Sequence, residues 1–150
     1  MIDHETGALT VREGRISPDI TRSAFATSPM AAGSSVDDMR TGWAQVTLAA
    51  QVDRGWTWGV RLLFDGERLD GYRLWIADAR FGVSWDDWSE DKELARRDAQ
   101  DAWLVEQLGE GVRIERPSGS VLTYSLPWGE AWSGYDPRSA GSDVGVRLRR

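Results

Sequence analysis

The sequence contains no cysteine and a single histidine, His4. Without cysteine the chain cannot form a disulfide, a thiolate metal site or a cysteine nucleophile. His4 stands near the start of the chain, where residues are usually mobile, so we expect neither a histidine-based metal site nor a serine–histidine–acid triad. No glycine-rich phosphate loop of the required spacing follows a predicted strand. The sequence therefore predicts no metal and no other cofactor, and it favours binding over catalysis.

Long apolar runs are also lacking, because no window approaches the roughly 18 uninterrupted apolar residues of a membrane span. The opening Met-Ile-Asp-His-Glu has neither the basic region nor the apolar stretch of a secretion signal. We therefore expect no membrane contact and a cytoplasmic location. We expect one domain over residues 1–150, with residues 1–7 disordered.

Basic residues are fewer than acidic ones: the sequence has 18 basic and 24 acidic residues, and its formal net charge is −6. The imbalance is local. The segment 84–110 holds 9 acidic and 3 basic residues, whereas the segments on either side of it together carry no net charge. An acidic segment repels a phosphate backbone, so we expect no binding to nucleic acid.

Nine tryptophans are the most unusual feature that the sequence does contain. Periodicity assigns most of them to the core, as it does for Trp56 and Trp58 on the apolar face of a strand at 56–64. Three fall outside this pattern. Trp75 lies on the less apolar face of the next strand, Trp85 at the entry of an acidic helix, and Trp132 in a glycine-rich segment.

Alternating apolar residues predict an antiparallel sheet of about six strands. The first three, at about 46–52, 56–64 and 69–78, are joined by short links that contain glycine and form a meander. Two more flank the turn Pro-Ser-Gly-Ser, and the last is at about 143–148. The segment 129–142 is predicted to be a long loop or an interrupted strand.

One long helix, at about 85–108, is predicted to pack on one face of this sheet, which gives an α+β fold. Ser84 or Ser89 can cap its start, where carboxylates suit the helix dipole, and Gly109 ends it. Its apolar stripe is expected to comprise Trp88, Ala95, Ala99, Ala102 and Trp103, widened by Leu94, Val105 and Leu108.

The first candidate site is the acidic start of the helix. There the charges would steer a basic protein partner toward the surface, and the indole would anchor it. A solvated helix face accounts for the same charges without a partner. The residues of this site are Trp85, Asp86, Asp87, Glu90 and Asp91.

The second candidate site is an aromatic-lined groove for a small molecule or a carbohydrate, formed by Trp75, Trp132 and Tyr135. A third hypothesis is a carboxylate-dependent hydrolase, which needs two acidic groups across a sugar. Glu130 and Asp136, or the acids beside Trp85, would supply them. The helix dipole and ordinary core packing account for these residues without catalysis.

Short motifs resemble those of small uncharacterised bacterial proteins of the toxin-immunity type. They are Leu9-Thr10-Val11, Trp103-Leu104 with Leu108-Gly109, Trp128-Gly129, and Ser133-Gly134-Tyr135-Asp136-Pro137-Arg138-Ser139. The resemblance spans about residues 8–148 and transfers no functional residue. It implies a stoichiometric inhibitor that binds a toxin without chemistry of its own. We therefore expect a non-catalytic protein-interaction module that is not an enzyme, with a homo-oligomer left open.

Overall fold

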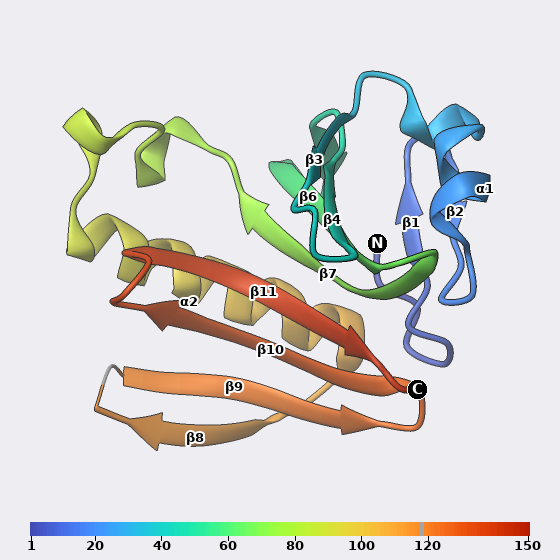
Figure 1. The fold of residues 1–150 in the computed structure, drawn as a ribbon. Helices are drawn as coiled ribbons and strands as arrows, with labels where there is room; N and C mark the ends of the chain where they lie inside the picture. Colours follow the sequence, from blue (N-terminus) through green and yellow to red (C-terminus); the bar gives the residue numbers. More distant parts are fainter. Residues whose placement is uncertain (118) are drawn as a thin grey trace.

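The computed structural model describes residues 1–117 and 119–150, which adopt an α+β fold with one long helix and an antiparallel sheet (Figure 1). Within these residues the main sheet has nine strands, and a separate hairpin has two. The prediction of about six strands was therefore too low. The prediction did not include the exposed strand at 35–38 or the regular glycine-rich strand at 129–136. The single strand predicted at 46–52 is divided into two strands.

The first half of the sheet contains the predicted meander. Its strands are β3 (Ser35–Asp38), β4 (Trp43–Thr47), β6 (Trp56–Asp65) and β7 (Arg68–Ile76), in that order. The strand expected at 46–52 is divided into β4 and β5 (Gln51–Asp53), which pair with different parts of β6. All four residues of β3 are exposed, so β3 lacks the alternation that reveals a strand in a sequence.

The second half of the sheet comprises β8 (Val112–Arg116), β9 (Gly119–Leu126), β10 (Gly129–Asp136) and β11 (Gly141–Leu148). Strand β11 pairs with β7 and joins the two halves, with Val144 opposite Leu74. The segment 129–142, expected to be a long loop or an interrupted strand, comprises β10, a turn and the start of β11. A Cβ on Gly129 would lie 2.0 Å from the carbonyl oxygen of Arg147, so this glycine permits close approach of strands.

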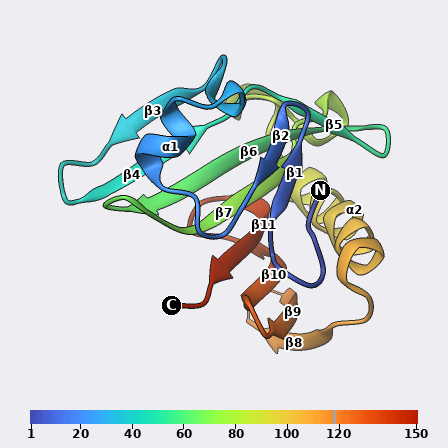
Figure 2. The ribbon, with the colours of Figure 1, turned by 90° about the vertical axis from the view of Figure 1, so that its right-hand side faces the viewer.

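The core lies on one face of the sheet. In β6, Trp58, Val60, Leu62 and Phe64 are buried, as the alternation predicts. The hairpin of β1 (Leu9–Val11) and β2 (Gly14–Ile16), together with α1 (Arg22–Ala26), covers the first half of this face, and α2 (Glu90–Leu108) covers the second (Figure 2). Among the described residues, no α-helix packs on the opposite face.

Residues 1–7, for which disorder is expected, are ordered against the sheet. Ile2 is buried and pairs with Leu9. The carbonyl oxygens of His4 and Gly7 accept hydrogen bonds from Trp128 Nε1 and from the buried Tyr72 hydroxyl, each at 2.9 Å. Tertiary hydrogen bonds therefore fix a segment that local composition marks as a free end.

Helix α2 begins at Glu90, so the helix predicted from residue 85 is shorter than expected. Residues 85–87 form a separate 3₁₀ turn, and Trp88 is extended with φ −74° and ψ 141°. Of the two candidate caps, Ser89 accepts a hydrogen bond from the Lys92 amide, whereas Ser84 makes no such bond. The break places the Trp88 indole where its Nε1 donates to the Ala140 carbonyl.

The buried face of α2 also differs from the predicted stripe, because Ala95 and Ala102 are exposed. The buried positions include three polar residues, and the full set is Glu93, Gln100, Asp101, Trp103, Leu104 and Leu108. Gln100 is fully buried and its side-chain oxygen accepts a hydrogen bond from the Ile76 amide at 2.9 Å. Polar residues with specific partners thus replace the alanines that the apolar pattern favours.

Candidate functional site

The Trp85 edge consists of Val83, Trp85 and Trp88 with the four carboxylates of residues 86–91. The side chains of Trp85 and Val83 are 77% and 72% exposed, and that of Trp88 is 37% exposed. The two indoles lie next to each other, with ring centroids 6.4 Å apart. Trp88 was predicted to be core and is instead part of this exposed apolar patch.

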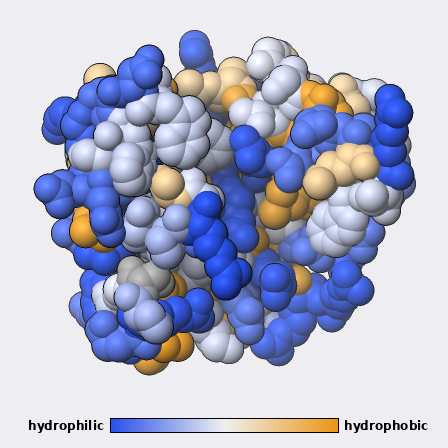
Figure 3. All heavy atoms as spheres, turned by 60° about the vertical axis from the view of Figure 1, so that its left-hand side comes forward, coloured by the Kyte–Doolittle hydropathy of each residue, from blue (hydrophilic) through white to orange (hydrophobic). Residues whose placement is uncertain are grey.

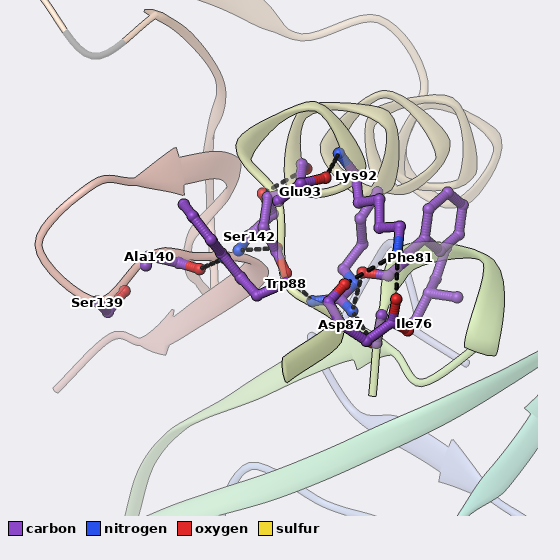
Figure 4. A network of polar contacts seen from close by, with 12 residues as sticks. Ile76, Phe81, Asp87, Trp88, Lys92, Glu93, Ser139, Ala140 and Ser142 are labelled. Carbon is purple, nitrogen blue, oxygen red and sulfur yellow. Dashed lines mark hydrogen bonds and ion pairs between the residues drawn. The ribbon is translucent and has the colours of Figure 1, made fainter. Parts of the chain in front are cut away.

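The carboxylates of the Trp85 edge differ in their partners. Asp87 forms an ion pair with Lys92, whose Nζ also donates to the Asp87 carbonyl at 2.9 Å (Figure 4). Asp86, Glu90 and Asp91 are exposed and form no ion pair within residues 1–117 and 119–150. Three negative charges therefore remain uncompensated beside the exposed indole of Trp85.

A buried network holds this edge to the sheet. The carboxylate of Glu93 accepts a hydrogen bond from the Ser142 amide at 2.9 Å, and the Ser142 hydroxyl donates to the Glu93 carbonyl at 2.7 Å (Figure 4). Arg96 pairs with Glu93 at 2.5 Å and donates to the carbonyls of Phe81 and Gly82. The sequence pattern does not reveal the burial of these residues, because charged side chains on a helix are normally exposed to solvent.

The second feature is a cavity of about 660 Å³ on the sheet face opposite the core, referred to below as the groove. Trp75 from β7 and Trp132 from β10 both line it, so two of the three predicted aromatic residues come together. The molecule is hollowed between hydrophilic side chains on the side shown in Figure 3. A smaller cavity of about 420 Å³, lined by Trp85 and Trp88, adjoins the groove and shares Trp75 and Arg96 with it.

Tyr135, the third predicted residue, occupies a different position. It lines the edge of the groove but alternates with Gly134 along β10, and its side chain is 8% exposed. Burial raises the pKa of the Tyr135 hydroxyl, and the charges of Glu90 and Glu93 add to this effect. The ring therefore lies on the helix side of the sheet, because neighbouring residues of a strand point to opposite faces.

Each groove tryptophan lies across a glycine of the neighbouring strand. Trp75 is opposite Gly59 and Trp132 is opposite Gly145. A Cβ on either glycine would come within 2.1 Å or 2.3 Å, respectively, of the indole ring. The absence of a side chain at these two positions therefore lets each indole lie flat on the sheet.

An arginine lies close to the ring of each indole. The guanidinium carbon of Arg61 is 5.5 Å from the Trp75 ring centroid, and that of Arg73 is 4.6 Å from the Trp132 centroid. Such cation–π contacts hold the arginine side chains over the groove. The groove thus holds two tryptophan–arginine pairs, each next to a glycine, and a Cβ on Gly145 would lie 2.3 Å from the Trp132 ring and 2.5 Å from the Arg73 guanidinium.

Replacing Gly59 with alanine is expected to displace Trp75 and lower the free energy of unfolding by about 1–3 kcal/mol, because the added methyl group overlaps the ring. Urea unfolding of the variant measures this change. Gly55→Ala is not a matched control, since Gly55 has a φ of 80°. Ala95→Ser, an exposed change, supplies one. Unchanged stability of Gly59→Ala would contradict the packing described for Trp75.

Glu130 and Asp136, one of the two sets of acids considered for hydrolysis, do not share a site. Asp136 lines the groove, whereas Glu130 lines a separate cavity next to β8 and β9. The part of the chain that the structure describes holds no group of three or more histidine, cysteine, aspartate or glutamate side chains placed to bind a metal ion. None of its helices combines the length and apolar character needed to cross a membrane.

Comparison of the chain with protein-family models, with curated proteins and with solved structures finds no match.

Proposed function

We propose that this chain is a non-catalytic protein-interaction module that binds a basic protein partner through the Trp85 edge. The observation that carries the proposal is the 77% exposure of Trp85 beside the 72% exposed Val83. A tryptophan of this exposure costs hydration free energy in the isolated protein, and burying it against a partner recovers that cost. Tryptophan is also the residue type most enriched among binding hot spots.

Charge supports the choice of a basic partner. Asp86, Glu90 and Asp91 follow the exposed Trp85 within six residues of the chain, and they form no ion pairs within the described ranges. Lysine and arginine side chains of a partner would meet these carboxylates at the rim of an apolar contact, and the same field would speed association. A stoichiometric inhibitor of a basic toxin, as the resemblance to immunity proteins implies, would use such a surface.

The test is capture of a partner from the native host by the tagged protein, followed by its identification and by binding kinetics. Changing the three unpaired acids together, as Asp86→Asn, Glu90→Gln and Asp91→Asn, keeps the Asp87–Lys92 pair and side-chain size. We expect the association rate constant to fall by about tenfold or more, and its salt dependence to weaken.

The matched control removes three exposed charges on other elements, as Glu13→Gln, Asp37→Asn and Glu115→Gln, and should leave the association rate within about twofold because none of them lines the cavity at Trp85 and Trp88. An acidic partner, or equal rates for both triple variants, would refute the proposal.

We propose binding of a small molecule in the groove as a second function, since Trp75 and Trp132 meet in one cavity whose volume suits such a ligand. A carbohydrate is less favoured than other small molecules. Each indole packs over a glycine of the neighbouring strand and has a guanidinium carbon 5.5 Å or 4.6 Å from its ring centroid, so the arginines compete with a sugar for contact with the rings.

A further inference from the structure

We infer that the groove binds an organic anion, with the acidic group of the ligand between Arg61 and Arg73. The inference rests on the second function proposed above and specifies its ligand. Four arginines line the groove, namely Arg61, Arg73, Arg96 and Arg116. They come from β6, β7, α2 and β8, so the fold gathers onto one surface charges that are far apart in the sequence.

The position of Arg61 and Arg73 points to a missing negative charge. The two residues are directly opposite each other on the neighbouring strands β6 and β7. Like charges at such a cross-strand pair destabilise a sheet. Local arrangements that oppose stability are found preferentially at functional sites. An anion between the two guanidinium groups would convert their repulsion into attraction to a common partner.

The protein itself only partly neutralises this pair. Arg61 forms no ion pair with any residue that the structure describes, and its Nε donates to the Thr47 hydroxyl at 3.4 Å. Arg73 approaches the carboxylate of Asp143 at 3.5 Å, a long contact for an ion pair. Arg96 forms an ion pair with Glu93. Arg116, at the far side of the groove, is exposed and has no carboxylate partner in the described ranges.

The shape of the groove favours an organic anion over a bare inorganic ion. The cavity of about 660 Å³ is in the range of sites for drug-sized ligands. From the arginine pair it extends past Trp132 and Val121 to Arg116. A ligand with one acidic group at Arg61 and Arg73 would therefore lay its apolar body along Trp132 and Val121.

Asp143 competes with the ligand for Arg73. Burial raises the pKa of this carboxyl, Asp136 raises it further, and Arg73 and Arg61 oppose the shift. As the pH falls through this raised pKa, Asp143 loses its charge and releases Arg73. Anion affinity should therefore rise on moderate acidification, as long as the ligand stays ionised, and Asp143→Asn should bind more tightly at neutral pH with a flatter pH dependence.

The experiment uses the indole N–H signals of the tryptophans in two-dimensional NMR spectra of the full chain, assigned by single Trp→Phe changes. The probes are 2-naphthoate and its neutral analogue 2-naphthamide, with inorganic pyrophosphate as a separate arm. We expect saturable shifts of the Trp75 and Trp132 signals with the anionic probes below about 10 mM, a weak but measurable affinity. The Trp85 signal should move least.

Two variants identify the charges responsible. Arg73→Gln and Arg61→Gln should each weaken binding of 2-naphthoate by about 10- to 100-fold, the usual effect of losing a charge-assisted hydrogen bond. Arg138→Gln is the control, because Arg138 is exposed and does not line the groove. Preserved signal dispersion in each variant shows that the fold is intact.

The outcomes separate the inference from the function on which it rests. Equal affinity for 2-naphthoate and 2-naphthamide, or no effect of Arg73→Gln, would overturn the anion site while leaving a small-molecule groove. No shift with any of the three probes would overturn both. Saturation by pyrophosphate with a similar loss in Arg73→Gln would assign a phosphate-bearing ligand, whereas saturation by 2-naphthoate alone would assign a carboxylate.

Discussion

The Glu93→Ala variant is expected to lose about 3–5 kcal/mol of unfolding free energy, because it leaves the buried guanidinium of Arg96 without its counter-charge. The exposed fractions of the Glu93 and Arg96 side chains are only 5% and 12%. The change also removes the acceptor of the Ser142 amide, so α2 loses one of its two hydrogen bonds to Ser142 of β11. Guanidinium chloride unfolding monitored by circular dichroism measures the difference.

Glu90→Ala is the matched control, since Glu90 is exposed in the first turn of the same helix and should cost less than about 1 kcal/mol. The double variant Glu93→Ala with Arg96→Ala should lose less than the sum of the two single changes, because the uncompensated charge is gone. A loss in Glu93→Ala no larger than in Glu90→Ala would show that the network does not stabilise the fold.

Replacing Trp103 with alanine should cost a similar amount, about 3–5 kcal/mol, because the change opens a cavity in the core. The Trp103 side chain is 2% exposed and packs on Trp58 with ring centroids 4.3 Å apart. Its Nε1 also donates to the Asp53 carboxylate at 2.7 Å, which links α2 to β5. Denaturant unfolding gives the loss directly.

Trp85→Ala provides the comparison for this core variant. Because Trp85 is 77% exposed, its removal should change the unfolding free energy by less than about 0.5 kcal/mol. The contrast between the two tryptophans separates residues that build the fold from those available for binding. Similar losses in the two variants would contradict the burial described for them.

Much of the fold could be predicted where one physical signal dominates. The alternation in β6 correctly places Trp58 in the core, and the short glycine-containing links correctly predict the meander. The end of α2 at Gly109 also follows from the sequence, because glycine readily takes the positive φ, here 80°, found at this position. These features depend on residues that are close together along the chain.

Features that depend on distant residues could not be predicted. Glu93 and Gln100 are buried only because Ser142 and Ile76 supply their partners, and no local pattern reveals those contacts. Gly134 and Gly129 resemble loop residues in sequence but lie in β10. Their role follows from the strands on either side, whose register the sequence does not specify.

The candidate sites follow the same division. Trp85, which the sequence pattern did not assign to the core, is exposed in the structure. Trp75 and Trp132, which were predicted to form one groove, line the same cavity. The cross-strand pair of Arg61 and Arg73 was not anticipated, because recognising it requires the register of β6 on β7. Tyr135 was grouped with the wrong face, because a long loop or an interrupted strand at 129–142 does not impose the regular alternation that separates Tyr135 from Trp132 in β10.

The measurement that tests the proposed function most directly is the dissociation constant of the captured partner with Trp85→Ser compared with the unchanged protein. Because Trp85 is 77% exposed, we expect its removal to leave the fold intact, so that a loss of affinity reports on the interface. We expect the affinity to fall by about 30-fold or more, as for a tryptophan hot spot, while Arg73→Gln in the groove leaves it unchanged. An affinity for Trp85→Ser within about twofold of the unchanged protein would contradict binding through the Trp85 edge.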